Sequence, residues 1–272
     1  MKYLFFDLDG TLLDSRKDIS SFSVETLRRL KKDGYVIGVS SGRALTGIRP
    51  VIGNIESLVD VIVCNCGADL YETEKGVLEH FHPIPKETVD EILRMFEGVK
   101  DLYVVFRTDD RFYANGFHPR VDLFRSANNF PSIHDPKEGG YESTQRIELV
   151  FPEEESREKN YELIRSKEIP GLTGYRSDYF LCEFVDSRNS KGNAIRTYVE
   201  RRGDSLDDVL CMGDSPNDIE MIEMCGLGVA MKNAEEAVKD AADEVTEYTN
   251  DEDGAARYLL KKLYGEEYHG IS

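Results

Sequence analysis

The fold is decided at residues 3–11, which read YLFFDLDGT. The first four of these, Tyr3–Phe6, are apolar on both faces of a strand and are followed at once by a turn signal. Such a run is typical of a strand that is buried on both sides, as in a parallel sheet. Asp7 and Asp9 come directly after it, and residues two apart along a strand point to the same side. The stretch therefore predicts a buried strand that brings two carboxylates to one site.

Further apolar runs alternate with helical patterns in most of the chain. The other predicted strands are Val36–Val39, Val61–Cys64, Val209–Met212 and Gly228–Ala230. Helical spacing is found at Val24, Leu27 and Leu30, at Ala194, Ile195, Tyr198 and Val199, and in a last helix expected from Ala255 to Leu263. This alternation predicts an α/β fold with a Rossmann-like parallel sheet and helices on both of its faces.

The alternation is interrupted from about Phe81 to Asp186. One helical face is expected at Val89–Phe96, and half-exposed strands are expected at Tyr103–Phe106, Phe112–Ala114, Ile147–Phe151 and Tyr179–Val185. This mixture indicates an inserted α+β domain with a mainly antiparallel sheet. We therefore expect a core made of residues 1–81 and 187–272 and an inserted domain of residues 82–186, with hinges at both crossings.

Acidic residues dominate the composition. The 272-residue chain has 34 Lys and Arg against 52 Asp and Glu, which gives a formal charge of −18. Such an excess repels the phosphate backbone of nucleic acids and anionic lipid surfaces, so neither nucleic acid nor membrane is expected as a partner. For a small anionic substrate, a metal ion or a few well-placed cations must supply the local positive charge.

Cysteine usage and the N-terminal segment predict a cytoplasmic protein. The five cysteines, at positions 64, 66, 182, 211 and 225, lack paired C-x-x-C spacing, which favours free thiols in a reducing compartment. Asp7 and Asp9 interrupt the apolar start before a signal-peptide core or a membrane span could form.

Two further motifs offer groups that can hold an anion. The second predicted strand leads into Ser41-Gly42-Arg43, a hydroxyl followed by a glycine whose backbone can approach an anion closely. Ser190-Lys191-Gly192 precedes a predicted helix, so Lys191 lies at a helix N-terminus, where the helix dipole disfavours a cation. That placement of Lys191 predicts an anionic partner for its ammonium group.

A fourth motif, Gly213–Asp218, follows the strand predicted at Val209–Met212 and reads GDSPND. Ser215 as N-cap, Pro216 in the first turn and Asp218 three residues after the cap form an ordinary helix start. The helix start leaves Asp214, at the end of the strand, without an explanation. Asp214 is therefore a candidate functional residue.

The four motifs are expected to meet. Three of them lie at predicted carboxyl ends of strands, and open parallel sheets bind their ligands at that edge. Together they supply three strand-end carboxylates for a hard cation, a hydroxyl and a lysine for anion oxygens, and helix N-termini directed at the same place.

With these motifs, the chain resembles the haloacid dehalogenase-like (HAD) superfamily over its whole length. It is most similar to the Cof-type phosphatases, which carry a large α/β cap (class IIB) inserted after the second motif. The matching segments are Phe6–Leu13, Ser41–Arg43, Lys191-Gly192 and Gly213–Asp218, with later matches at Asn233-Ala234 and Asp253-Gly254. Two residues depart from the family pattern: Cys66 stands where Asn is frequent, and Asn189 where an apolar residue is usual.

The resemblance implies a Mg²⁺-dependent phosphomonoester hydrolase that works through an aspartyl-phosphate intermediate. Asp7 would be the nucleophile, and Asp9 would protonate the leaving oxygen and then activate water. The residues implied in holding the phosphoryl group are Ser41, Gly42, Lys191 and Asn217. Those implied in binding Mg²⁺ are Asp7, Asp9 through its backbone carbonyl, Asp214 and Asp218.

A small phosphorylated metabolite is the expected substrate. Sugar phosphates are favoured, because a cap over a narrow site admits a small body, while pyridoxal phosphate, FMN and nucleotides remain open. A phosphomutase with the same Asp7 and Asp9, or a non-catalytic sensor of a phosphorylated metabolite, is the alternative. An insert that only stabilises an oligomer is the alternative to a cap. A nucleotide-dependent oxidoreductase is disfavoured, because Gly226-Leu227-Gly228 lacks the third glycine of the dinucleotide-binding motif.

Overall fold

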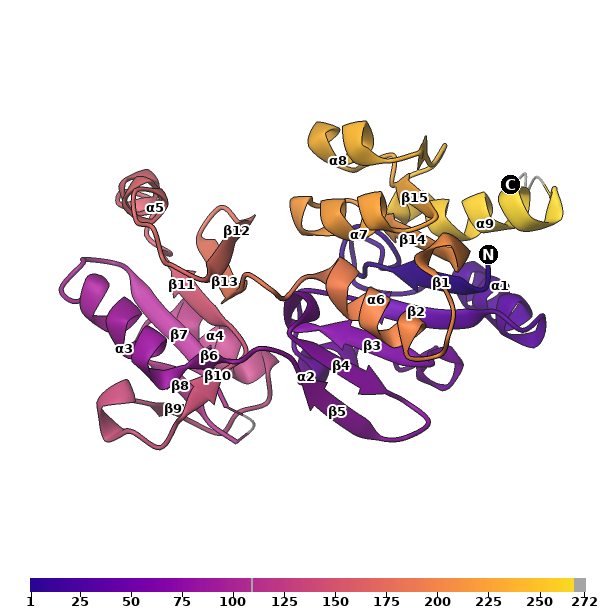
Figure 1. Cartoon of the computed structure of the whole chain (residues 1–272). Helices are drawn as coiled ribbons and strands as arrows, with labels where there is room; N and C mark the ends of the chain where they lie inside the picture. The colour runs from indigo at the N-terminus through magenta and orange to yellow at the C-terminus, as the bar shows by residue number, and fades with distance from the viewer. Residues whose placement is uncertain (109, 267–272) are drawn as a thin grey trace. The chain divides into compact units, whose positions relative to one another are not determined.

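The chain forms two compact units in the computed structural model, which describes residues 1–108 and 110–266 (Figure 1). The first unit is made of Met1–Glu79 together with the chain from Ser190 onward, and the second of His80–Asn189. Every residue for which a catalytic or ligand role is predicted lies in the first unit. The assignment of the two units as core and cap stays a prediction.

An eight-stranded sheet forms the centre of the first unit, in the order β16-β15-β14-β1-β2-β3-β4-β5. Its strands are β1 (Tyr3–Phe6), β2 (Val36–Ser40), β3 (Val61–Cys64), β4 (Asp69–Glu72), β5 (Val77–His80), β14 (Val209–Gly213), β15 (Leu227–Ala230) and β16 (Glu244–Val245). β1 pairs in parallel with β2 and β14, and parallel pairing continues to β3 on one side and to β16 on the other. β4 runs antiparallel to β3. The predicted α/β class with a parallel core sheet is confirmed.

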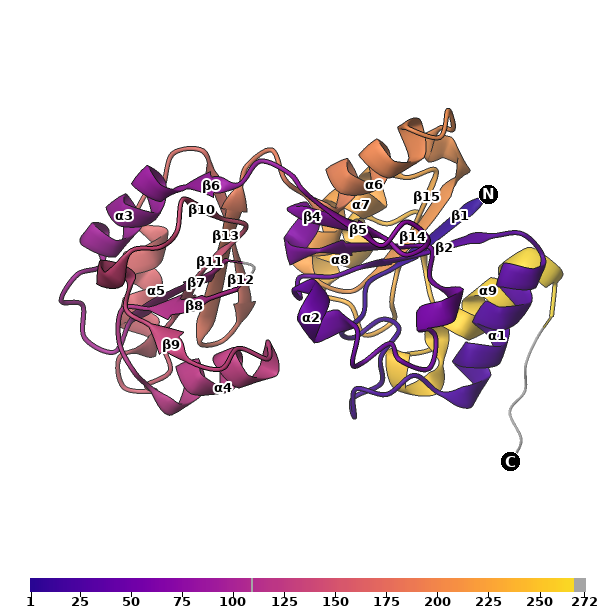
Figure 2. The same ribbon diagram turned by 90° about the horizontal axis from the view of Figure 1, so that it is seen from below.

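Helices cover both faces of this sheet. They are α1 (Ser21–Lys32), α2 (Leu45–Ile48), α6 (Lys191–Glu200), α7 (Ile219–Met224), α8 (Glu236–Ala241) and α9 (Gly254–Tyr264). α1 packs against α9, whereas α6 packs against α7, and Figure 2 shows these two pairs on opposite sides of the sheet. All four residues of β1 are buried between the two helical layers, which explains why that strand is apolar on both faces.

The second unit contains a six-stranded sheet in the order β12-β13-β11-β7-β8-β9 and a two-stranded ribbon, β10-β6. The strands are β6 (Ile84–Pro85), β7 (Tyr103–Arg107), β8 (Phe112–Ala114), β9 (Ile133–His134), β10 (Ser143–Thr144), β11 (Ile147–Val150), β12 (Leu172–Asp178) and β13 (Leu181–Asp186). All neighbouring pairs in the larger sheet are antiparallel except β8 and β9. The strand predicted at Tyr179–Val185 begins two residues too early, because Tyr179 and Phe180 form the turn between β12 and β13.

The α-helices that the structure describes in the second unit are α3 (Lys86–Met95), α4 (Pro119–Ala127) and α5 (Arg157–Arg165). Val89 of α3 and Ile164 of α5 belong to the apolar cluster that includes Val104, whereas Val121 of α4 belongs to a second cluster that includes Val105. Successive residues of β7 therefore face different helices, as the alternation of side chains along a strand requires.

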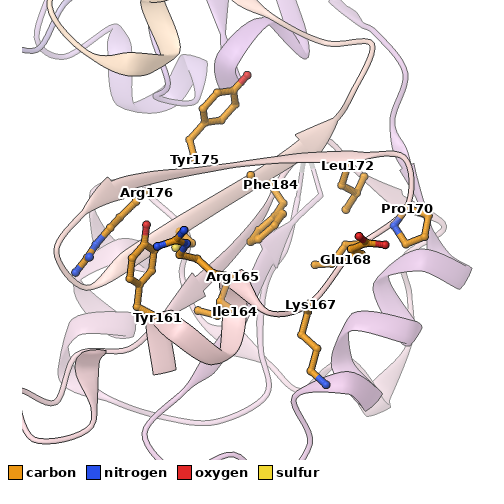
Figure 3. A pocket seen from close by; sticks show the side chains of 13 residues that line it. Tyr161, Ile164, Arg165, Lys167, Glu168, Pro170, Leu172, Tyr175, Arg176 and Phe184 are labelled. Atoms are coloured by element: carbon orange, nitrogen blue, oxygen red, sulfur yellow. The ribbon is translucent and has the colours of Figure 1, made fainter. Parts of the chain in front are cut away.

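A pocket of about 450 Å³ lies between α5 with the segment after it and the β12–β13 hairpin (Figure 3). Figure 3 shows the Phe184 ring pointing toward the segment that follows α5, whereas the ammonium group of Lys167 points away from the ring. Every residue that lines the pocket belongs to the second unit. The carboxylates described below belong to the first unit.

Asn189 joins the two chain segments at which the second unit begins and ends. Its Nδ2 donates to the carbonyl oxygens of Phe81 at 2.8 Å and His82 at 3.2 Å, and the residue is only 3% exposed. The apolar side chain that the resemblance leads us to expect at this position could not make these bonds. Asn189, which departs from the expected pattern, thus links the two chain segments by hydrogen bonds.

Candidate active site

The carboxyl end of the central strand β1 carries Asp7. Its backbone N–H donates to the carbonyl oxygen of Met212 in β14 at 2.9 Å, so the ladder between the two strands extends to this residue. Asp7 is 5% exposed. The neighbouring strands β2 and β14 end beside β1, which brings the loops after all three strands to the same edge of the sheet.

Three carboxylates gather at this edge: Asp7, Asp214 and Asp218, which we call the carboxylate cluster. Each offers one oxygen, and these oxygens lie within 4.8 Å of one another. Asp214 follows β14 directly, and Asp218 ends the short 3₁₀ helix η5 (Pro216–Asp218). The predicted single helix start at Ser215 is therefore a 3₁₀ turn, after which α7 begins at Ile219.

The backbone of the loop after β14 holds Asp218. Its Oδ2 accepts hydrogen bonds from the backbone N–H groups of Asp214 and Ser215, each at 3.0 Å. Its other oxygen, Oδ1, accepts from Lys191 Nζ at 2.6 Å. Both oxygens are thus engaged, and the fully buried Asp218 serves as the connection between the loop and Lys191.

Lys191 lies at the first position of α6, behind the N-cap Ser190, whose hydroxyl accepts from the N–H of Asn193 at 3.0 Å. Its Nζ donates to Asp7 Oδ1 at 2.7 Å as well as to Asp218. The anionic partner expected for this lysine is therefore provided by the chain itself. Burial alone would lower the pKa of Lys191, but Asp218 and Asp7 outweigh it and raise that pKa above the ordinary value.

The cluster carries more negative charge than Lys191 neutralises. Burial raises the pKa of Asp7 well above its ordinary value, with Lys191 opposing the shift and Asp218 and Asp214 adding to it. Burial and the nearby Asp218 raise the pKa of Asp214 to about 6. Three oxygen donors with this excess charge are a donor set that fits a hard divalent cation. The cluster is therefore compatible with a divalent metal site.

Gly10 and Thr11 fix Asp214 from the side of β1. Gly10 adopts φ +83°, a left-handed conformation, and any side chain there would run into the Asp214 carboxylate. The Thr11 hydroxyl donates to Asp214 Oδ1 at 3.0 Å, and Asn233 Nδ2 donates to the carbonyl oxygen of Gly10 at 2.7 Å. The match at Asn233 noted in the sequence thus supports the turn that follows β1.

Asp9 lies outside the carboxylate cluster. Arg43 donates to both of its oxygens, from Nε to Oδ2 and from Nη2 to Oδ1, each at 2.6 Å, and Lys17 Nζ donates to Oδ1 at 2.7 Å. Burial by itself would raise the pKa of Asp9, but the hydrogen bonds from Arg43 and Lys17 outweigh it and hold that pKa below its ordinary value. The sequence reasoning assigned no role to Arg43 or Lys17. Arg43 directly follows Ser41-Gly42 and could have been noticed, whereas no pattern marks Lys17.

Ser41 and Gly42 begin the loop after β2. Ser41 is 1% exposed, its N–H donates to the carbonyl oxygen of Val63 in β3 at 2.9 Å, and its Oγ accepts from the N–H of Arg43 at 3.2 Å. The structure thus places the predicted phosphate-binding hydroxyl at the carboxyl end of a strand next to β1. Its role in phosphate binding stays a prediction.

Asn217 and Cys66 meet at another side of the site. Asn217 Nδ2 lies 3.9 Å from Cys66 Sγ, within the range of a weak N–H···S hydrogen bond. Cys66 belongs to the turn Asn65–Gly67, and a side chain at Gly67 would collide with the backbone of Ser190. The turn Asn65–Gly67, in which Cys66 departs from the family pattern, therefore packs against the start of α6. Lys191 lies at that start.

Known proteins resemble this chain along its whole length. A family model described as haloacid dehalogenase-like hydrolase matches residues 4–259. The phosphatase YwpJ of Bacillus subtilis (strain 168) is 31% identical, with 97% of this chain and 100% of YwpJ covered. The pyridoxal phosphate phosphatase YbhA of Escherichia coli (strain K12) is 27% identical, with 96% of this chain and 98% of YbhA covered. The structure of the HAD subclass IIB sugar phosphatase BT4131 has a TM-score of 0.82 at 25% identity, covering 97% of this chain and 99% of that chain.

The helices within residues 1–108 and 110–266 are too short or too polar to cross a membrane.

Proposed function

Because the chain belongs to the haloacid dehalogenase-like hydrolases and is a phosphatase, we propose that it is a Mg²⁺-dependent phosphomonoesterase that uses Asp7 as a covalent nucleophile. The observation that carries this proposal is the buried contact of Asp7 with Lys191, at 2.7 Å, inside the carboxylate cluster. A carboxylate beside a fixed cation is suited to attack phosphorus, because the cation reduces the repulsion between the two anions.

Each predicted site residue takes a role in this mechanism. Asp7 attacks phosphorus, and Asp9 first protonates the leaving oxygen and then activates the water that hydrolyses the aspartyl-phosphate. Phosphoryl oxygens are held by Lys191 and by groups of the loops after β2 and β14, namely Ser41, Gly42 and Asn217. The positions of these loops at one edge of the sheet support the assignment.

The residues present fit Mg²⁺. Asp7, Asp214 and Asp218 would offer carboxylate oxygens, and Asp9 its backbone carbonyl. When bound, Mg²⁺ supplies the positive charge that stabilises the transferring phosphoryl group. The raised pKa values of Asp7 and Asp214 support this assignment, since burial and, after it, the neighbouring carboxylates disfavour the charged form of each group, and a bound cation would favour it.

We propose sugar phosphates as the leading substrate class. The first unit's motifs account for the phosphoryl group alone, so we assign recognition of the rest of the substrate to the second unit, acting as a cap. The names of the relatives support a small substrate, because BT4131 is a sugar phosphatase and YbhA a pyridoxal phosphate phosphatase. A cap domain can enclose a small substrate of this kind while it excludes water from the site.

A panel of phosphorylated metabolites tests the proposal directly. Purified protein with Mg²⁺ is assayed for release of inorganic phosphate from sugar phosphates, pyridoxal phosphate, FMN and nucleoside monophosphates. The proposal predicts a kcat/KM for one sugar phosphate that exceeds those for the other classes by about tenfold or more. Transfer of the phosphoryl group to a sugar hydroxyl without release of phosphate would instead assign a phosphomutase.

A further inference from the structure

The resting arrangement of Asp9 opposes its proposed chemistry. Arg43 and Lys17 place three charge-assisted donors on the Asp9 carboxylate, at 2.6, 2.6 and 2.7 Å. A carboxylic acid must present an O–H to the leaving oxygen, and a general base must accept a proton from water. The three donors occupy most of the acceptor sites of the Asp9 carboxylate and stabilise its charged form, so Asp9 is better suited to either role once at least one of the cations has moved away.

The cations that hold Asp9 are accessible. The side chains of Arg43 and Lys17 are 30% and 53% exposed, and that of Asp9 is 37% exposed. Lys191, in contrast, is 1% exposed and is held between two buried carboxylates. An incoming anion can therefore reach Arg43 without breaking the buried part of the site.

The formal charges favour an exchange of partners. The carboxylate cluster and Lys191 together carry a formal charge of −2, which one Mg²⁺ balances. The net charge of that group is then zero, so Lys191 and Mg²⁺ can contact the phosphate of a monoester but do not balance its two negative charges. The guanidinium fork of Arg43 matches phosphate oxygens as well as carboxylate oxygens, and a dianion attracts it more strongly than a single carboxylate does.

We propose that Arg43, assisted by Lys17, is a substrate-binding residue whose resting partner is Asp9. The phosphate of the substrate accepts the hydrogen bonds of the Arg43 guanidinium in place of Asp9. This exchange leaves the Asp9 carboxyl group free to face the leaving oxygen. No covalent bond changes in this step, since one set of hydrogen bonds replaces another. The inference rests on the proposed function, because it takes Asp9 as the acid and base and a phosphate as the ligand.

Binding of inorganic phosphate tests the exchange without requiring turnover. Isothermal titration calorimetry on the intact Mg²⁺-loaded protein compares wild type with Arg43→Gln, Arg43→Lys, Asp9→Asn and the double variant Arg43→Gln/Asp9→Asn. Arg28→Gln is the matched control, because Arg28 is exposed and forms an ion pair with Glu25 within α1. Circular dichroism confirms that each variant is folded.

The proposal predicts two results together. Arg43→Gln weakens phosphate binding by about tenfold or more, with Arg43→Lys in between and Arg28→Gln unchanged. Asp9→Asn tightens phosphate binding, because the competitor for Arg43 is weakened, and this tightening largely disappears in the Arg43→Gln background.

Either of two results overturns the proposal. An unchanged phosphate affinity in Arg43→Gln means that Arg43 only positions Asp9. An equal tightening by Asp9→Asn in both backgrounds means that Asp9 acts by charge repulsion alone and does not mask Arg43. Failure of the proposed function is separate, since it is seen as a wild-type protein that releases no phosphate from any monoester.

Discussion

Lys191 Nζ lies 2.7 Å from Asp7 Oδ1, although the two residues are 184 positions apart in the chain. The lysine is buried and also contacts Asp218. It is therefore part of the structure that holds Asp7, the proposed nucleophile, as well as a candidate phosphate ligand. Removal of one partner from a buried ion pair leaves an uncompensated charge.

Lys191→Met is expected to abolish turnover and to destabilise the metal-free protein by about 3–5 kcal/mol at pH 8, because Asp7 and Asp218 lose their buried cation. The loss of stability should be smaller at pH 5, because the raised pKa of Asp7 lets that carboxylate accept a proton more readily there. Thermal unfolding followed by circular dichroism at both pH values measures this. Lys239→Met, at an exposed lysine paired with Glu236, is the control and should leave the unfolding temperature nearly unchanged.

Chelation of divalent metals should abolish activity, and added Mg²⁺ should restore it. Mg²⁺ should also raise the unfolding temperature of wild type with increasing concentration, since it binds the folded cluster. Ca²⁺ should bind but inhibit, because its longer and more flexible coordination disturbs the geometry of in-line transfer. Phosphate release at the full rate in excess chelator would refute the metal assignment.

Asp214→Asn should stabilise the metal-free protein at neutral pH. The folded-state pKa of Asp214, about 6, lies above the ordinary value of 3.8, so its favourable contribution is present below pH 3.8 and is lost as the pH rises through 6. Above that pH the charged Asp214 side chain destabilises the folded protein. The neutral amide of Asn should therefore raise the free energy of unfolding by about 1–3 kcal/mol. The same variant should lose the stabilisation by Mg²⁺.

Thermal unfolding in chelator at pH 7.5 and pH 4 checks this prediction. The increase in unfolding temperature caused by Asp214→Asn should be present at pH 7.5 and nearly absent at pH 4. Asp207→Asn, at an exposed position near the start of β14, is the matched control. A lower unfolding temperature for Asp214→Asn at pH 7.5 would show that the charge of Asp214 does not destabilise the metal-free protein.

Asn189→Ala should weaken the tie between the two chain crossings. The variant removes the two hydrogen bonds that Asn189 donates to the carbonyl oxygens of Phe81 and His82, which is expected to lower the free energy of unfolding by about 1–3 kcal/mol. Asn189→Leu, with the apolar character usual in the family, should not restore the loss. Equal urea midpoints for wild type and both variants would show that the tie contributes no stability.

The core strands could be predicted because burial on both faces leaves a continuous apolar run, as in β1 and β14. The hairpin β4–β5 was missed, since its outer strand Val77–His80 is largely exposed and mixes polar with apolar residues. β16 has only two residues, which is too short to leave a pattern. Apolar periodicity therefore identifies the strands that form the centre of the sheet and misses those at its edges.

The candidate site was predictable where a residue occupies the end of a strand, as Asp7 and Asp214 do. Its contacts were not predictable, because they join loops that are distant in sequence. The sequence indicated that Lys191 needs an anionic partner, but only the fold shows that Asp7 and Asp218 provide it. The engagement of Asp9 by Arg43 likewise depends on the approach of the loops after β1 and β2.

The central claim is that Asp7 carries the phosphoryl group during turnover, and rapid acid quench followed by peptide mass spectrometry tests it most directly. The Asp9→Asn variant is mixed with its best substrate and Mg²⁺ and quenched within the first turnover, since loss of the general base should slow breakdown of the intermediate. The account predicts a phosphoryl group on the peptide that contains Asp7, and none in an Asp7→Asn variant. Phosphate release without phosphorylation of that peptide, or near-normal turnover by folded Asp7→Asn protein, would contradict it.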